Sequence, residues 1–121
     1  MNTINDVVVG IIQLAKKIAE SSNSTTHSLL KETGYFDIHA QISVAAIQAE
    51  LRLHPSCISD WVQFSEDKRT TDGWYLKQDG ANYEVGFCSL SKKDTLPEKY
   101  TDKIEACAAF IKHEIEAIRN S

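Results

Sequence analysis

Residues 73–87, with the pair Asp79-Gly80 at their centre, restrict the fold more than any other part of this sequence. Asp-Gly is a preferred pair for a two-residue hairpin turn, because both positions need a positive φ. A hairpin folded at that pair sets Leu76 opposite Tyr83 and gives the ribbon one apolar face. That face comprises Trp74, Leu76, Ala81, Tyr83, Val85 and Phe87. A slip by one residue would destroy the face, so the pattern predicts an antiparallel hairpin in this register.

The C-terminal part predicts a long amphipathic helix from about Pro97 to Arg119. Thr95 and Glu98 form a capping start, and proline suits the first turn of a helix. Apolar residues then recur at helical spacing, namely Tyr100, Ile104, Cys107, Ala108, Ile111, Ile115 and Ile118. So long an apolar stripe has to be buried, most simply across the apolar side of the hairpin.

The first half of the chain predicts three helices, at about Ile4 to Glu20, Ser28 to Thr33 and Asp37 to Leu53. Gly34 is well placed to end the second of them. The third is apolar around so much of its circumference that we expect it to be central and largely buried. Residues 55–64 fit either a short helix or the approach to a strand.

These elements predict one α+β domain covering residues 1–121. It has N-terminal helices, an antiparallel β-hairpin or small sheet, and a long C-terminal helix. A chain of 121 residues with 42% apolar and 25% charged residues is ordinary for a globular domain. At this length about two-thirds of the unfolded surface is buried on folding, which is enough for one core without disulfides or metal.

The sequence holds no catalytic or metal-binding signature, and we expect no cofactor. Cys57, Cys88 and Cys107 are odd in number and none belongs to a C-x-x-C pair, so we expect free thiols. A zinc site would need about four ligands, usually in two spaced pairs. No basic segment precedes the first apolar run, and that run is too short to span a bilayer. We therefore expect a cytoplasmic protein that does not bind membranes.

The acidic charge is concentrated in the middle of the chain. The formal net charge is −4, and residues 60–84 carry six acids against three bases, whereas the flanking segments are nearly balanced. Nucleic acid is an unfavourable ligand, because binding phosphates needs a basic patch. Carboxylates beside exposed aromatic residues are typical of an interface with a basic protein.

The sequence thus predicts a partner-binding surface within residues 60–84. Its members are Asp60, Trp61, Glu66, Asp67, Asp72, Tyr75, Asp79 and Glu84. The alternative is that Trp61 and Trp74 belong to the core, that Tyr75 packs on a neighbouring element, and that the carboxylates form a solvated face.

In its small size, acidic balance, hairpin at residues 73–87 and following amphipathic helix, the chain resembles small bacterial toxin-immunity proteins. These include the immunity proteins of contact-dependent growth inhibition systems. The resemblance implies a non-enzymatic inhibitor that covers the active site of a toxin domain, often a nuclease whose basic groove would match the acidic residues. Two alternatives remain open. One is a small cysteine-dependent enzyme that uses Cys57, and the other is a homo-oligomeric structural or adaptor subunit.

Overall fold

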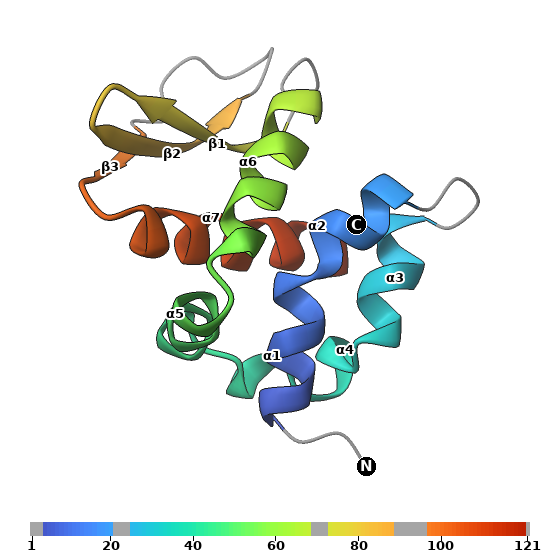
Figure 1. The fold of residues 1–121 in the computed structure, drawn as a ribbon. Coiled ribbons are helices and arrows are strands. Elements are labelled where there is room, and N and C mark those ends of the chain that lie inside the picture. The colour runs from blue at the N-terminus through green and yellow to red at the C-terminus, as the bar shows by residue number, and fades with distance from the viewer. Residues whose placement is uncertain (1–3, 21–24, 69–72, 89–96, 121) are drawn as a thin grey trace.

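The chain forms the predicted α+β fold, with a long helix lying across one face of a small antiparallel sheet (Figure 1). The computed structural model describes residues 4–20, 25–68, 73–88 and 97–120. Its elements are α1 (Ile4–Ile12), α2 (Leu14–Glu20), α3 (Thr26–Glu32), α4 (Tyr35–Ile38), the 3-10 helix η1 (His39–Gln41), α5 (Val44–Leu53), α6 (Ser56–Lys68), β1 (Gly73–Asp79), β2 (Asn82–Cys88), β3 (Glu98–Tyr100) and α7 (Lys103–Arg119). The strands form one sheet in the order β1-β2-β3, and both pairs are antiparallel.

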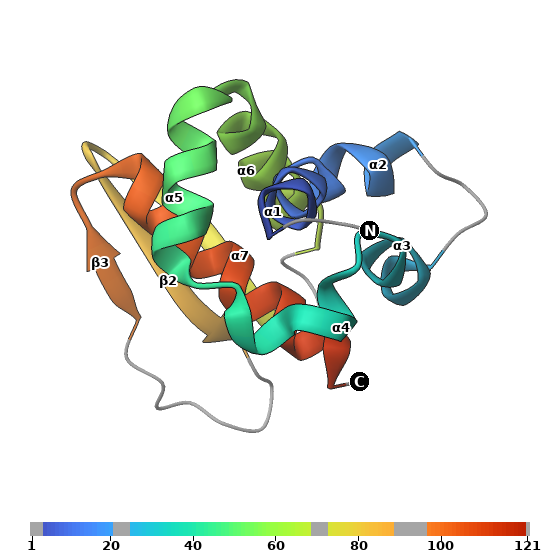
Figure 2. The same cartoon turned by 90° about the horizontal axis from the view of Figure 1, so that it is seen from below.

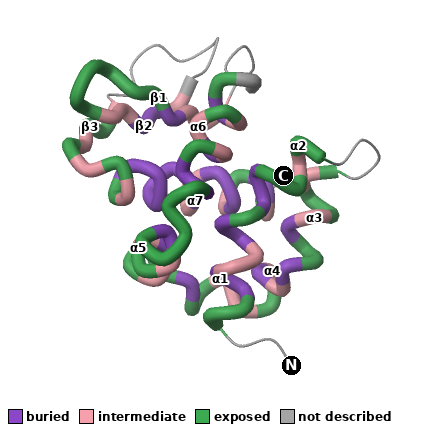
Figure 3. The backbone as a smooth tube through the Cα atoms, in the orientation of Figure 1, coloured by how far each residue is buried: buried purple, intermediate pink, exposed green. Residues whose placement is uncertain are grey.

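Helix α7 forms the centre of the core. Every residue from Ala106 to Ile111 is buried, a pattern that a helix covered on one side alone cannot produce. The sheet contacts α7 on one side, while α3, α5 and α6 pack around the rest of it (Figure 2). The same burial is visible as a continuous purple segment along α7 in Figure 3. The predicted apolar stripe is therefore buried, and neighbouring elements also cover faces of the helix outside that stripe.

The predicted start of this helix is wrong. Residues Glu98–Tyr100 pair with β2 as strand β3, and the helix begins only at Lys103. Asp102 caps it, since its Oδ1 accepts a hydrogen bond from the Ile104 N–H at 2.8 Å. A side-chain acceptor at this position satisfies an orphan N–H of the first turn. Thr95, the predicted cap, lies outside the described residues.

The β1–β2 hairpin has the predicted apolar face in a different register. Leu76 lies opposite Val85 rather than Tyr83, and the loop is Gly80-Ala81. Gly80 has a φ of 62°, and no described residue other than glycine has a positive φ. A positive φ at the first of the two loop positions, and not at the second, fits a type II′ turn. The predicted turn needed a positive φ at both loop positions. The pairing has moved by two residues, and because side chains alternate with a period of two, the faces are kept.

Helix α6 protects the outer edge of β1. Ser65 is buried, and its Oγ accepts a hydrogen bond of 2.6 Å from the Leu76 N–H. An unpaired N–H at a sheet edge is a template for pairing with another chain, so this bond closes the edge at that point. Residues 55–64, which fitted either helix or strand, lie almost wholly in α6.

The remaining N-terminal helices follow the sequence patterns in part. α1 and α2 together cover the predicted helix, with one interruption at Gln13. Thr25 caps α3, since its Oγ1 accepts from the Ser28 N–H at 3.1 Å. Gly34, with a φ of 90°, follows its end, which is the left-handed position that favours glycine.

The predicted helix from Asp37 to Leu53 is wrong in its first half and in its burial. Ser43 is extended, and its Oγ caps α5 by accepting from the Ala46 N–H at 3.1 Å. A serine that satisfies the first turn of a new helix favours a break before it. Helix α5 then buries only Ile47 and Leu51, and Leu53 is 71% exposed. The central position that we predicted for this helix belongs to α7.

A polar network ties α7 to α4 and to the segment between α4 and α5. The Tyr35 hydroxyl donates to Glu116 Oε2 at 2.6 Å, and Lys112 Nζ donates to the Tyr35 oxygen at 2.9 Å and to the Ile42 carbonyl at 2.8 Å. Arg119 Nε donates to Glu116 Oε2 at 2.8 Å. The Arg119 hydrogen bond and that of Tyr35 hold the pKa of Glu116 at about 2 although partial burial opposes the shift. Burial and the same carboxylate raise the pKa of Tyr35.

This network predicts an acid-dependent loss of stability. The folded pKa of Glu116 lies at about 2, below its ordinary value of 4.5. The stabilisation is therefore present above about pH 4.5 and is lost as the pH falls toward 2. Urea unfolding across this range should show a steeper pH dependence for the wild type than for Glu116→Gln, which cannot titrate. Glu32→Gln, on the exposed surface of α3, serves as the control. Equal slopes for wild type and Glu116→Gln would contradict the assignment.

Candidate protein-binding surface

Three of the predicted partner-binding carboxylates lie on adjoining elements at the surface. Asp60 and Glu66 belong to α6, Asp79 ends β1, and α6 packs directly against β1. Glu66 and Asp79 are exposed and Asp60 is partly exposed. In the described part of the chain, no lysine or arginine forms an ion pair with any of the three. Among the described residues, therefore, none of these three carboxylates has a cationic partner.

For two further predicted partner-binding residues, Asp67 and Asp72, the structure gives little or no information. Asp67 occupies the last turn of α6, but its side chain lies outside what the structure describes, and Asp72 lies outside it altogether.

The hairpin contributes less negative charge than the sequence suggests. Glu84 lies between Lys77 on β1 and Lys99 on β3, which are its Cα partners on the two neighbouring strands. Opposite charges directly across a sheet stabilise each other modestly. Glu84 also accepts a hydrogen bond of 2.7 Å from the Tyr75 hydroxyl. The Tyr75 ring in turn covers Gly86, where a Cβ atom would come within 2.6 Å of the phenol oxygen. Glu84 and Tyr75 thus form part of a balanced, internally bonded sheet face.

Trp61 is not a surface residue, which corrects its inclusion among the partner-binding residues. It is fully buried, and its Nε1 donates to the Ile12 carbonyl at 2.9 Å. Its ring packs edge-on against Phe64 and Phe110, with centroids 5.4 Å and 5.9 Å away. A buried indole whose N–H has found a partner is a core residue.

Trp74 has an intermediate position at the end of the sheet. Its ring stacks flat on that of His113, with centroids 3.8 Å apart and an interplanar angle of 8°. His113 Nε2 lies 3.4 Å from Glu98 Oε1, which joins α7 to β3. Glu98 also accepts a 2.6 Å hydrogen bond from Tyr100, and burial together with this carboxylate raises the pKa of Tyr100 to about 12. These contacts fix the sheet on α7, and Trp74 serves packing there.

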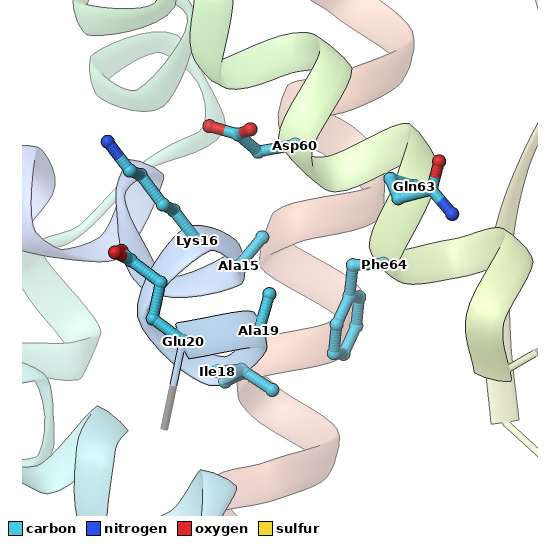
Figure 4. Close-up of a pocket in the computed structure, with 8 residues that line it drawn as sticks. All are labelled: Ala15, Lys16, Ile18, Ala19, Glu20, Asp60, Gln63 and Phe64. Atoms are coloured by element: carbon cyan, nitrogen blue, oxygen red, sulfur yellow. The ribbon is translucent and has the colours of Figure 1, made fainter. Parts of the chain in front are cut away.

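A concave feature lies between α2 and α6, as a groove of about 450 Å³. Figure 4 shows that its two ends differ in character. At one end the Phe64 ring of α6 faces small apolar side chains of α2. At the other end Asp60, Lys16 and Glu20 gather. The apolar lining residues are Ala15, Ile18, Ala19 and Phe64. We name this feature the α2–α6 groove.

A second hollow of about 360 Å³ adjoins the groove and shares its charged residues. It contains Cys57 and His54, the pair that a cysteine-dependent enzyme would use. The Cys57 side chain is buried, and burial together with the nearby Asp60 carboxylate raises the pKa of the thiol, against a smaller effect of Lys16. Nucleophilic cysteines need the opposite shift, because the thiolate is the reactive form.

Cys57 should therefore react slowly with iodoacetamide near neutral pH in the folded protein. Limited exposure and a small thiolate fraction act in the same direction. Alkylation followed by peptide mapping separates Cys57 from the other two cysteines, and the chain unfolded in urea gives the reference rate. Labelling of Cys57 in the folded chain at or above the reference rate would revive the enzyme alternative.

The sequence patterns did not reveal the residues that α2 contributes to the groove, among them Lys16, Glu20 and Ala19. The available signal was the interrupted apolar pattern of the first helix, in whose second half, α2, the apolar residue Ala19 is exposed. That pattern alone does not reveal which helix lies opposite. Only the packing of α2 on α6 brings these residues to Asp60.

Comparison with protein-family models, with characterised proteins and with solved structures found no match in any of the three. Among the described residues, no group of three or more histidine, cysteine, aspartate or glutamate side chains is placed to hold a metal ion. In the same part of the chain, no helix combines the length and apolarity needed to cross a membrane.

Proposed function

We propose that this protein is a non-enzymatic protein-binding inhibitor whose partner is a basic protein. The observation that carries the proposal is the set of carboxylates at Asp60, Glu66 and Asp79 on adjoining elements. All three reach solvent, and no described lysine or arginine pairs with them. Carboxylates without a cationic partner on adjoining elements can attract a positive partner at long range and reject acidic competitors.

The resemblance to bacterial toxin-immunity proteins gives the partner a more specific form. In this proposal the partner is a toxin domain met in the cytoplasm, and the acidic surface covers its active site. A nuclease is the favoured toxin, because a groove that binds phosphates is positively charged. The buried Cys57 thiol with its raised pKa supports inhibition by contact rather than by chemistry.

The partner can be sought first in the neighbouring genes and by affinity capture from the native cell. Stopped-flow association with that partner then tests the surface. We expect Glu66→Lys and Asp79→Lys each to lower the association rate constant about tenfold at low salt, with a smaller effect on dissociation. For the wild type, association should slow steeply as the salt concentration rises.

Asp37→Lys is the matched control, because Asp37 is exposed on α4, away from α6 (Figure 2). It changes the net charge by the same amount as the test variants and leaves the proposed surface intact. Equal slowing by Asp37→Lys would show that only net charge matters. Unchanged rates for folded Glu66→Lys and Asp79→Lys variants would reject the acidic surface as the binding site.

A further inference from the structure

The α2–α6 groove offers two different environments along one path. Phe64 lines it from α6, and Ile18 and Ala19 line it from α2. Farther along, the carboxylates of Asp60 and Glu20 reach it from opposite helices (Figure 4). A side chain that enters past Phe64 would therefore meet apolar walls first and then a charged end, where two carboxylates lie beside the single cation Lys16.

We propose that this groove binds an arginine side chain of the partner, an inference that rests on the proposed basic partner. The methylene stem of arginine packs against the apolar end, between Phe64 and Ala19. The guanidinium reaches the charged end and donates to Asp60 and Glu20. Long cationic side chains combine an apolar stem with a charged head in just this order.

Arginine fits the charged end better than lysine. A guanidinium presents five N–H donors in a planar fork, so it can serve two carboxylates that come from different helices. It is also more weakly hydrated than an ammonium group, which lowers the cost of entering a partly apolar groove. Its stem and plane can both contact the Phe64 ring, where a cation gains further attraction.

Lys16 allows a test in which two substitutions should change arginine binding in opposite directions. Its side chain lies at the same end of the groove, but it forms no ion pair with Asp60, Glu20 or any other described carboxylate. The carboxylates therefore remain available, while the Lys16 charge repels an incoming cation. Removing that charge should strengthen arginine binding, whereas removing the Asp60 charge should weaken it.

The test is an NMR titration of the isotopically labelled full chain with N-acetyl-arginine methylamide. We expect backbone amide shifts in residues 15–20 and 60–64, and weaker shifts with the lysine and norleucine analogues. Asp60→Asn should weaken binding roughly tenfold, as expected for a charge-assisted hydrogen bond. Lys16→Gln should strengthen it, and Ala19→Leu, at an exposed position that tolerates bulk, should block it. Asp79→Asn, outside the groove, should leave it unchanged.

Shifts that are absent, equal for the lysine analogue, or insensitive to Ala19→Leu would overturn the proposal, as would weaker binding by Lys16→Gln. The probe needs no partner protein, so its result is separate from that of the charge-reversal experiment. Arginine binding in the groove combined with unchanged association of Glu66→Lys and Asp79→Lys would reject the acidic surface and keep the groove. The reverse outcome would keep the surface and reject the groove.

Discussion

Replacing Ile111 with aspartate is expected to destabilise the protein by about 3 kcal/mol or more. Ile111 is fully buried at the centre of α7, and a carboxylate there would lie in the apolar core without a partner. Because a domain of this size has a total stability of roughly 5–15 kcal/mol, the loss should be plain in a thermal melt followed by circular dichroism.

Ala117→Asp is the matched control for this prediction. Ala117 belongs to the same helix and is exposed, so the new carboxylate stays hydrated. We expect a cost below about 1 kcal/mol there, mainly from a negative charge near the helix C-terminus. An Ile111→Asp variant that melts like the wild type would mean that α7 does not occupy the centre of the core.

Trp61→Ala is expected to cost about 3–5 kcal/mol, the range for truncating a buried aromatic residue. The substitution removes the packing of the indole on Phe64 and Phe110 and leaves the Ile12 carbonyl without its N–H donor. Trp61→Phe keeps an aromatic ring and removes that hydrogen bond, so its cost should be smaller, at about 1–3 kcal/mol.

Urea unfolding of the two variants checks this order. The same variants decide between the structural role of Trp61 and the partner-binding role that the sequence suggested. A Trp61→Ala variant of normal stability that only loses affinity for the partner would restore the second role.

Features set by local backbone geometry could be predicted from the sequence. The apolar stripe from Cys107 to Ile118 identified a buried helix, because residues three and four apart share a helix face wherever the helix packs. The two faces of the hairpin were also correct, although the register was displaced by two residues. A period of two fixes which residues share a face, but it does not fix the pairing when alternative turns can close the loop.

The candidate site was only partly predictable, because charge in a sequence window is not charge on a surface. Glu84 lies in the acidic window, yet Lys99 joins it from β3 only through pairing of strands that the sequence did not predict. Trp61 falls in the same window but points into the core. Asp60, by contrast, reaches solvent and gains new neighbours in Lys16 and Glu20.

Local sequence patterns were enough to predict the helices at both ends of the chain, the hairpin and the two faces of that hairpin. These depend on caps, turn residues and apolar spacing, which act over a few residues. Long-range packing places α7 rather than α5 at the centre, brings Ser65 to the edge of β1, and makes α2 and α6 enclose a groove. Those outcomes depend on which apolar faces fit together across long separations in the chain, and no local pattern encodes that fit.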